Sequence, residues 1–188
     1  MKKLYHGTLS DFRKIDINYG NGYKDFGKGF YATSVKRHAE SIAKRNKKIA
    51  IDRDISLCKS IKGRKRINYT AYRYNFDFDD SCLHSGLLNV KIFNQADINW
   101  VRFILVNRQC EFTSHNYDIV IGPTADDNTV AIINDYMNEL LSSNYDNTVL
   151  QRLLFDLHPE NLPKQYFFAT EKSLNYVKFS NIWREIVL

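Results

Sequence analysis

The sequence predicts an α+β fold, with strands near both ends of the chain and helices between them. Strand patterns open the chain at 4–7 and 29–33, and others stand near its end at 165–170 and 177–179. No linker, internal repeat or low-complexity tract separates the intervening pieces. We therefore expect residues 1–188 to form a single mixed domain in which early and late strands meet.

The predicted strands alternate apolar with polar residues, or form short apolar runs bounded by glycine or proline. They are 4–7, 29–33, 66–78, 87–93, 117–122, 165–170 and 177–179. The clearest pattern lies in 66–78, where Tyr72, Tyr74, Phe76 and Phe78 recur at every second position. Such a period is typical of a half-buried strand.

Helices are predicted where apolar residues recur at helical spacing. They are expected at about 35–47, 98–106, 129–139 and 147–155. In the first, Ala39, Ile42 and Ala43 share one face and the basic residues the other, and Ser34 is expected to cap its start.

The composition indicates a globular protein, because 44% of residues are hydrophobic and 14% aromatic. No apolar run reaches about eighteen residues, and the first residues lack the apolar stretch of a signal peptide. We therefore expect a cytoplasmic protein with no membrane partner. Cys58, Cys82 and Cys110 are odd in number and lack metal-ligand spacing, so we expect reduced structural thiols and no metal site.

The net charge of +6 is concentrated in 36–48 and 59–66. Such clusters attract phosphate backbones, although a solvated face is the plainer interpretation of each cluster alone.

Two short segments near the start carry the strongest functional signal. Tyr5-His6-Gly7-Thr8 closes the first predicted strand, and Phe26-Gly27-Lys28-Gly29-Phe30-Tyr31 leads into the second. Two later segments accompany them: Asp-Ile-Val-Ile-Gly-Pro-Thr-Ala-Asp-Asp at 118–127 and Gln-Tyr-Phe-Phe-Ala-Thr-Glu at 165–171. The early glycines have neither the Walker spacing nor that of a Rossmann turn, so those nucleotide folds are set aside.

In these segments the chain resembles the ADP-ribosyltransferases of the poly(ADP-ribose) polymerase and diphtheria-toxin type. It is more closely similar to a family of small bacterial toxin-like domains that share all four segments, so that the resemblance spans nearly the whole chain. The resemblance implies an ADP-ribosyltransferase-like fold, in which a split mixed or antiparallel β-sheet core has flanking helices. It also implies NAD as the substrate, without a metal.

The resemblance assigns roles to the residues of the first two segments. His6 is expected to donate a hydrogen bond to the adenosine ribose, and the Gly7 backbone to pair with the nicotinamide carboxamide. Tyr31 is expected to stack on the nicotinamide ring. Thr8 and Gly29 complete the expected NAD-binding set together with position 42.

Two positions depart from the family pattern. Ile42 stands where many relatives carry a second aromatic residue that sandwiches the nicotinamide. Gln165 stands where these enzymes usually have a glutamate, so the expected catalytic set is His6, Tyr31 and Gln165. A glutamine amide can position the ribose, but it lacks the carboxylate charge that stabilises an oxocarbenium-like centre.

Other polar residues of the shared segments have several interpretations. Asp126 and Asp127 are a metal pair, a general base for the acceptor, or caps for the helix expected near 129, and capping is favoured. A carboxylate on the acceptor side is the second interpretation. Arg108 either meets the NAD pyrophosphate on that side or pairs with Asp118 or Asp126.

The expected function is therefore NAD-dependent mono-ADP-ribosyl transfer to a protein or nucleic acid, with nicotinamide release. The resemblance further implies a toxin of a toxin–antitoxin or phage-defence system, with an antitoxin protein as partner. Two alternatives stand beside it: a non-catalytic NAD or ADP-ribose binding module, which the departures at Ile42 and Gln165 favour, and an NAD glycohydrolase with water as acceptor.

Overall fold

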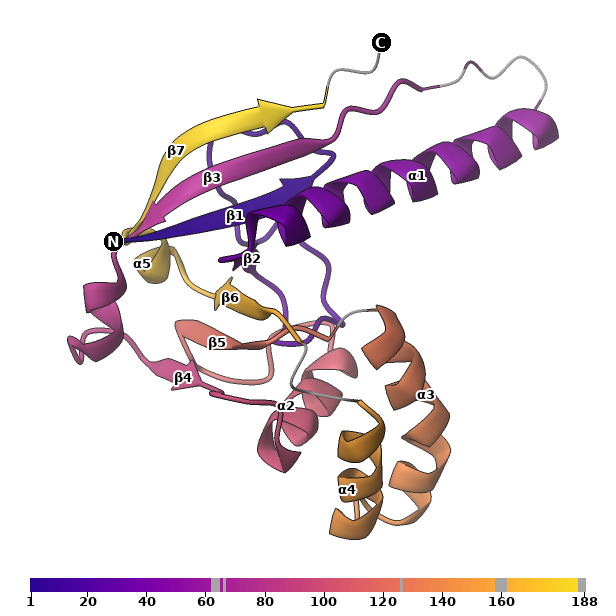
Figure 1. Cartoon of the computed structure of the whole chain (residues 1–188), viewed down its shortest axis with the longest axis vertical. Helices are drawn as coiled ribbons and strands as arrows, with labels where there is room; N and C mark the ends of the chain where they lie inside the picture. The colour runs from indigo at the N-terminus through magenta and orange to yellow at the C-terminus, as the bar shows by residue number, and fades with distance from the viewer. Residues whose placement is uncertain (62–64, 66, 126, 158–161, 186–188) are drawn as a thin grey trace. The chain divides into compact units, whose positions relative to one another are not determined.

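The computed structural model describes residues 1–61, 65, 67–125, 127–157 and 162–185, with the backbone alone at 127 and 128. The chain divides into two compact units (Figure 1). The first unit contains Met1–Ile15, Ala32–Asp80 and Tyr176–Leu188, and the second contains Asp16–Tyr31 and Ser81–Asn175.

The predicted α+β class is confirmed, because strands and helices occur in both units. The strands are β1 (Lys2–Thr8), β2 (Phe30–Thr33), β3 (Tyr72–Phe78), β4 (Val90–Ile92), β5 (Ile119–Pro123), β6 (Lys164–Phe168) and β7 (Val177–Arg184). The helices are α1 (Lys36–Ser60), α2 (Ile98–Arg108), α3 (Asp127–Ser142), α4 (Asn147–Asp156) and α5 (Glu171–Leu174), with a short 3-10 helix at Asp80–His84. Strand pairing is mixed, since β4 and β5 are parallel and the other pairs described below are antiparallel.

In the first unit, antiparallel strands follow the order β2-β1-β3-β7. Strand β1 pairs with β3 over its whole length, whereas β1 and β2 pair at Tyr5 and Thr33. The alternation predicted for β3 buries Tyr74, Phe76 and Phe78 on one side of the strand. Helix α1 lies along β1 (Figure 1). It buries Ala39 and Ala43 of the predicted stripe, whereas Ile42 is half-buried.

Helix α1 differs from its prediction at both ends. It begins after Val35, which makes no side-chain cap, rather than after a capping Ser34, and it continues beyond 47 to Ser60. The charged second half offers little apolar signal, but Asp54 is buried there and its carboxylate accepts a hydrogen bond from the Ile67 backbone nitrogen at 2.8 Å. Strand β3 begins at Tyr72 rather than at 66, and the Ile67 nitrogen donates to this helix side chain instead of to a neighbouring strand.

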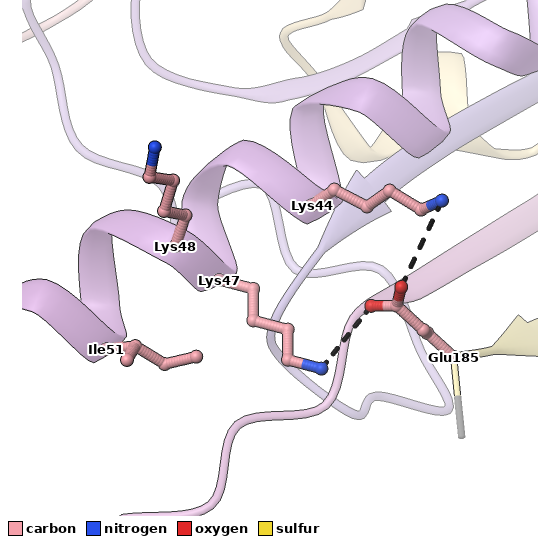
Figure 2. Close-up of a pocket in the computed structure, with 5 residues that line it drawn as sticks. All are labelled: Lys44, Lys47, Lys48, Ile51 and Glu185. Carbon is pink, nitrogen blue, oxygen red and sulfur yellow. Dashed lines mark hydrogen bonds and ion pairs between the residues drawn. The ribbon is translucent and has the colours of Figure 1, made fainter. Parts of the chain in front are cut away.

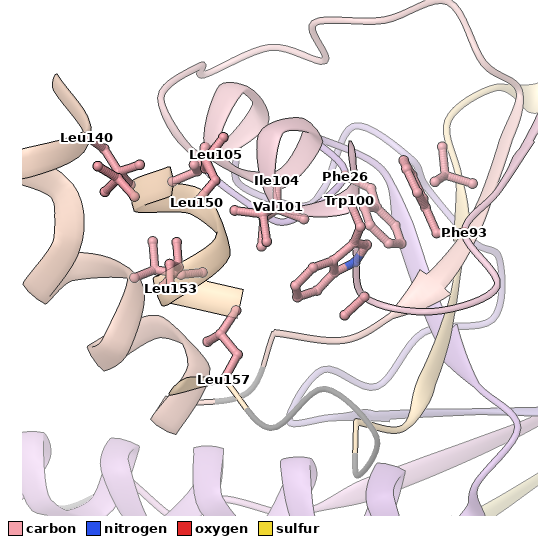
Figure 3. Close-up of a cluster of buried hydrophobic side chains, with 14 of the residues drawn as sticks. Phe26, Phe93, Trp100, Val101, Ile104, Leu105, Leu140, Leu150, Leu153 and Leu157 are labelled. Carbon is pink, nitrogen blue, oxygen red and sulfur yellow. The ribbon is translucent and has the colours of Figure 1, made fainter. Parts of the chain in front are cut away.

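In the second unit, the strands follow the order β4-β5-β6, with β5 and β6 antiparallel. Helices α2, α3 and α4 supply much of a large apolar core (Figure 3). Its buried residues include Phe26, Phe93, Trp100, Val101, Ile104, Val120, Leu140, Leu150, Leu153 and Phe167. The buried strand predicted at 117–122 is confirmed as β5, every residue of which is buried.

Several boundaries in this unit shift by a few residues. Helix α2 begins at Ile98 as predicted, because Asp97 caps it by accepting a hydrogen bond from the Trp100 backbone nitrogen at 2.8 Å. Helix α3 begins at Asp127 rather than near 129.

None of the three cysteines forms a disulfide. Among the described residues, no helix has the length and apolar character needed to cross a membrane.

Candidate functional site

In the second unit, two of the segments singled out in the sequence and Arg108 donate to one buried carboxylate, that of Asp25, which directly precedes the 26–31 segment. One oxygen, Oδ1, accepts hydrogen bonds from the Arg108 guanidinium, with Nε at 2.9 Å. The other, Oδ2, accepts from Gln165 Nε2 at 2.8 Å and from the Ala125 backbone nitrogen at 2.9 Å. Asp25 is only 6% exposed, so this set of donors replaces the water that an ionised carboxylate requires.

Regular elements hold the partners of Asp25 in place. Gln165 lies on β6 opposite Gly122 of β5, and Arg108 ends α2. The Pro123 carbonyl at the end of β5 accepts from Gln165 Nε2 at 3.3 Å and from Trp100 Nε1 at 3.0 Å. A fully buried indole therefore fixes the same carbonyl that helps to fix the glutamine.

These contacts determine which way the Gln165 amide faces. Asp25 Oδ2 and Pro123 O are both acceptors, so the side-chain nitrogen must face them and Oε1 must face away. Within the part of the chain that the structure describes, nothing donates to Oε1, and no buried side-chain polar atom lacks a partner. The Gln165 oxygen is therefore not fully enclosed and is available as an acceptor, in a side chain that is 8% exposed.

Tyr31 closes the segment that begins at Asp25. Its hydroxyl donates to the Gly27 carbonyl at 2.7 Å and accepts from the Phe26 backbone nitrogen at 3.0 Å. Its ring centroid lies 4.8 Å from that of Phe167, and the half-buried ring packs against the core. Burial, followed by the nearby Asp25 charge, raises the pKa of Tyr31 well above its ordinary value, so the phenol stays protonated at neutral pH.

His115 holds the same segment from another side. Its Nδ1 accepts from the Tyr117 backbone nitrogen at 3.2 Å, which requires the proton on Nε2, and Nε2 donates to the Phe26 carbonyl at 2.9 Å. The ring stacks on Phe103 with centroids 5.0 Å apart. Burial lowers the pKa of His115, so the imidazole is neutral at pH 7.

Gly29 allows the close approach of this segment to β6. A Cβ atom at Gly29 would lie 2.6 Å from both the Phe167 ring and the Phe168 carbonyl. Glycine is therefore required at this position by packing within the second unit.

The remaining predicted NAD-binding residues belong to the first unit. His6 is half-buried on β1, and its ring contacts the edge of Phe12 with centroids 5.9 Å apart. Thr8 Oγ1 accepts from the Ser10 backbone nitrogen at 3.1 Å, and Ile42 is half-buried on α1.

Gly7 has a packing reason that the sequence did not reveal. A Cβ atom there would lie 1.9 Å from the Ala39 carbonyl oxygen of α1. The space that a side chain would fill is therefore occupied by the helix backbone, which glycine allows to approach β1 closely.

The acidic residues named as partners have different positions. Arg108 pairs with Asp25, not with Asp118, whose carboxylate accepts from the Asn89 backbone nitrogen at 2.8 Å and from Thr170 Oγ1 at 2.7 Å. Asp126 lies outside the described residues, and Asp127 begins α3 with its side chain outside them. In the described ranges, no group of three or more His, Cys, Asp or Glu residues is arranged to hold a metal.

Asp25 is the residue that sequence reasoning missed. It stands directly before the Phe26-Gly27 motif, but a single aspartate in a glycine-containing loop is usually a solvated residue. Its Gln165 partner is 140 positions away. Its adjacency to a shared motif is the one local signal that pointed to it.

A second feature, in the first unit, is a basic pocket of about 280 Å³ lined by Lys44, Lys47, Lys48, Ile51 and Glu185 (Figure 2). Lys47 and Lys44 pair with Glu185, at 3.4 and 4.0 Å. Two ammonium groups pair with this one carboxylate, while that of Lys48 points away from it (Figure 2). The pocket therefore has an excess of positive charge, which attracts anions.

Comparison with known proteins gives one family match. No curated protein and no solved structure matches the chain. One family model, described as "Protein of unknown function (DUF3990)", matches residues 2–179, a span that includes all four sequence segments and the Asp25 cluster. The chain therefore belongs to the DUF3990 family.

Proposed function

We propose that the protein is an NAD-dependent mono-ADP-ribosyltransferase that modifies a macromolecule and releases nicotinamide. The observation that carries the proposal is the meeting of Arg108, Gln165 and the Asp25–Tyr31 segment in the second unit. The support is that Gln165, one residue of the expected catalytic set, shares its Asp25 partner with Arg108, and that Tyr31 ends the segment that Asp25 begins. An outward amide oxygen at position 165 has the chemistry needed to accept a hydrogen bond from a ribose hydroxyl.

The proposed reaction breaks the bond between the nicotinamide nitrogen and the ribose carbon. The electron pair leaves with nicotinamide, an oxocarbenium-like centre develops, and a nucleophile on the acceptor attacks the ribose carbon and loses a proton. By the resemblance, His6 and Gly7 hold the two ends of NAD and Tyr31 supports the nicotinamide. Positioning of this kind contributes a large part of such rate enhancements.

The acceptor is proposed to be a protein or a nucleic acid. The basic pocket at Lys44, Lys47 and Lys48 favours a polyanionic acceptor, because its charge excess attracts phosphates. The resemblance supports a toxin role, with an antitoxin protein as the neutralising partner. Growth arrest on induced expression, relieved by a neighbouring gene product, is the expected behaviour.

The first test follows nicotinamide release and NAD binding for the pure protein and for His6→Ala. His6 is half-buried, so the change should leave the fold intact and weaken NAD binding by about five- to tenfold, the value of one hydrogen bond. Isothermal titration and circular dichroism measure the two effects. His84→Ala, at an exposed position, is the matched control and should bind NAD as the unmodified protein does.

Tyr31 needs a milder change than truncation. Its ring packs against the core, so Tyr31→Ala would remove apolar contacts as well as any ligand contact. Tyr31→Phe keeps the ring and removes the hydroxyl that bonds to Gly27 and Phe26. As the control, Tyr136→Phe removes a hydroxyl that bonds to Asp156.

The products distinguish the candidate functions. NAD binding without nicotinamide release, with candidate acceptors present, would support the binding module, which the neutral Gln165 favours. Free ADP-ribose without a modified macromolecule would support the glycohydrolase. Absence of both binding and release would reject the proposal.

A further inference from the structure

We propose that Asp25 is a positioning residue that aims the Gln165 side-chain oxygen at the ribose hydroxyl next to the bond that breaks, an inference that rests on the proposed function. Asp25 is not proposed to contact NAD itself. It acts through the hydrogen bond between its Oδ2 and Gln165 Nε2, at 2.8 Å.

The geometry gives the glutamine one orientation. An isolated amide can rotate by half a turn and present either its nitrogen or its oxygen, because the two ends have similar shape. Here a carboxylate and the Pro123 carbonyl both demand a donor, so the rotated state would place oxygen against two acceptors. The oxygen therefore faces outward in the absence of any ligand.

Asp25 is itself held from three directions. Arg108 binds Oδ1, while the Ala125 backbone and Gln165 bind Oδ2. Removing one partner of such a buried set leaves an uncompensated charge or donor, so the carboxylate has little freedom to turn. Through Asp25, the end of α2 and the loop after β5 together fix the orientation of the Gln165 side chain.

The carboxylate also changes the electronic character of the amide. Donation of an N–H group to an ionised acceptor in a low-dielectric site polarises the donor amide and increases the negative charge on its oxygen. A polarised oxygen supplies part of the stabilisation that a glutamate would provide in related enzymes. An apolar or neutral residue at position 25 could pack in the same place, but it could not polarise the Gln165 amide.

The central experiment compares steady-state nicotinamide release by the unmodified protein, Asp25→Asn and Gln165→Ala. For Asp25→Asn we expect a fall in kcat on the order of tenfold or more, with KM for NAD changed by about twofold or less. KM should change little because the other contacts to bound NAD remain. The kcat should fall because the polarised oxygen that stabilises the transition state is lost. Gln151→Glu, on the exposed face of α4, is the control and should match the unmodified protein.

Gln165→Glu supplies a second and opposite test. The new carboxylate would face the Asp25 carboxylate and the Pro123 carbonyl, so we expect lower stability and lower release at pH 7. If Gln165 merely occupied the place of a catalytic glutamate, the new charge would instead preserve or raise nicotinamide release. The double variant Asp25→Asn, Gln165→Glu restores one donor and one acceptor and should recover part of the lost kcat.

A measurement on the unmodified protein covers the case in which the variants do not fold. In glutamine-labelled protein, the Gln165 side-chain amide protons should exchange slowly, and NAD should shift the Gln165 side-chain carbonyl resonance while leaving that of exposed Gln109 unchanged. No shift at Gln165 on saturation with NAD would overturn the inference. So would Asp25→Asn with the kcat of the unmodified protein, whereas an unmodified protein that neither binds NAD nor releases nicotinamide would overturn the proposed function as well.

Discussion

At the scale of single residues, His115 links the pH of the solution to the segment that carries Asp25. The neutral ring bridges the Phe26 carbonyl and the Tyr117 nitrogen, and protonation of Nδ1 would replace the second bond by a contact between two donors. The lowered pKa of His115 follows from burial, which disfavours the charged form. The segment should therefore be held less firmly in acid.

The sign of the pH effect follows from the direction of this shift. The pKa is about 6.5 in the unfolded chain and lower in the folded protein, so stability is fully present above about pH 6.5. It should decrease as the pH falls through the folded pKa. Urea unfolding between pH 7.5 and 5 measures this decrease, which should be smaller in His115→Gln than in the exposed-site control His84→Gln. Parallel curves for the two variants would contradict the prediction.

At the scale of elements, Gly7 determines how closely α1 approaches β1. Gly7→Ala would place a methyl group 1.9 Å from the Ala39 carbonyl, a backbone atom that cannot turn aside. We expect a loss of about 1–3 kcal/mol in the free energy of unfolding, as overpacked cores show. Chemical denaturation measures it.

Gly20→Ala is the matched control, since the nearest atom to the new methyl group would be the Gly29 carbonyl oxygen, at 3.3 Å. It should cost less than Gly7→Ala. Equal costs for the two substitutions would mean that α1 can move away from β1 freely. Because Gly7→Ala changes packing, a loss of NAD binding in that variant would not by itself assign a ligand contact to the glycine.

At the scale of the whole molecule, the net charge of +6 favours association with polyanions. If the acceptor is a nucleic acid, log affinity should fall linearly with log salt concentration. Lys48→Glu, in the basic pocket, should reduce affinity and the steepness of that line, whereas the exposed Lys24→Glu is the control. Fluorescence anisotropy with a labelled oligonucleotide measures both. Identical salt dependence in the two variants would favour a protein acceptor.

Much of the secondary structure was predictable because its signals are local. Alternating aromatic residues indicated β3, a buried apolar run before Gly122-Pro123 indicated β5, and Asp97 marks the start of α2. The errors fall where a distant partner decides the outcome. The Asp54 carboxylate, buried on α1, accepts a hydrogen bond from the Ile67 nitrogen, thirteen positions away, and no local pattern indicates that contact.

The candidate site divides in the same way. The motifs by themselves pointed to His6, Gly7, Tyr31 and Gln165 through a resemblance, and the α+β class through hydrophobic periodicity, because both are written in neighbouring residues. Only the tertiary structure decided that Asp25 binds Gln165 and Arg108, and that the glutamine oxygen faces outward. The physical reason is that a buried carboxylate must find donors wherever the folded chain provides them, and donors from distant segments leave no periodic pattern in the sequence.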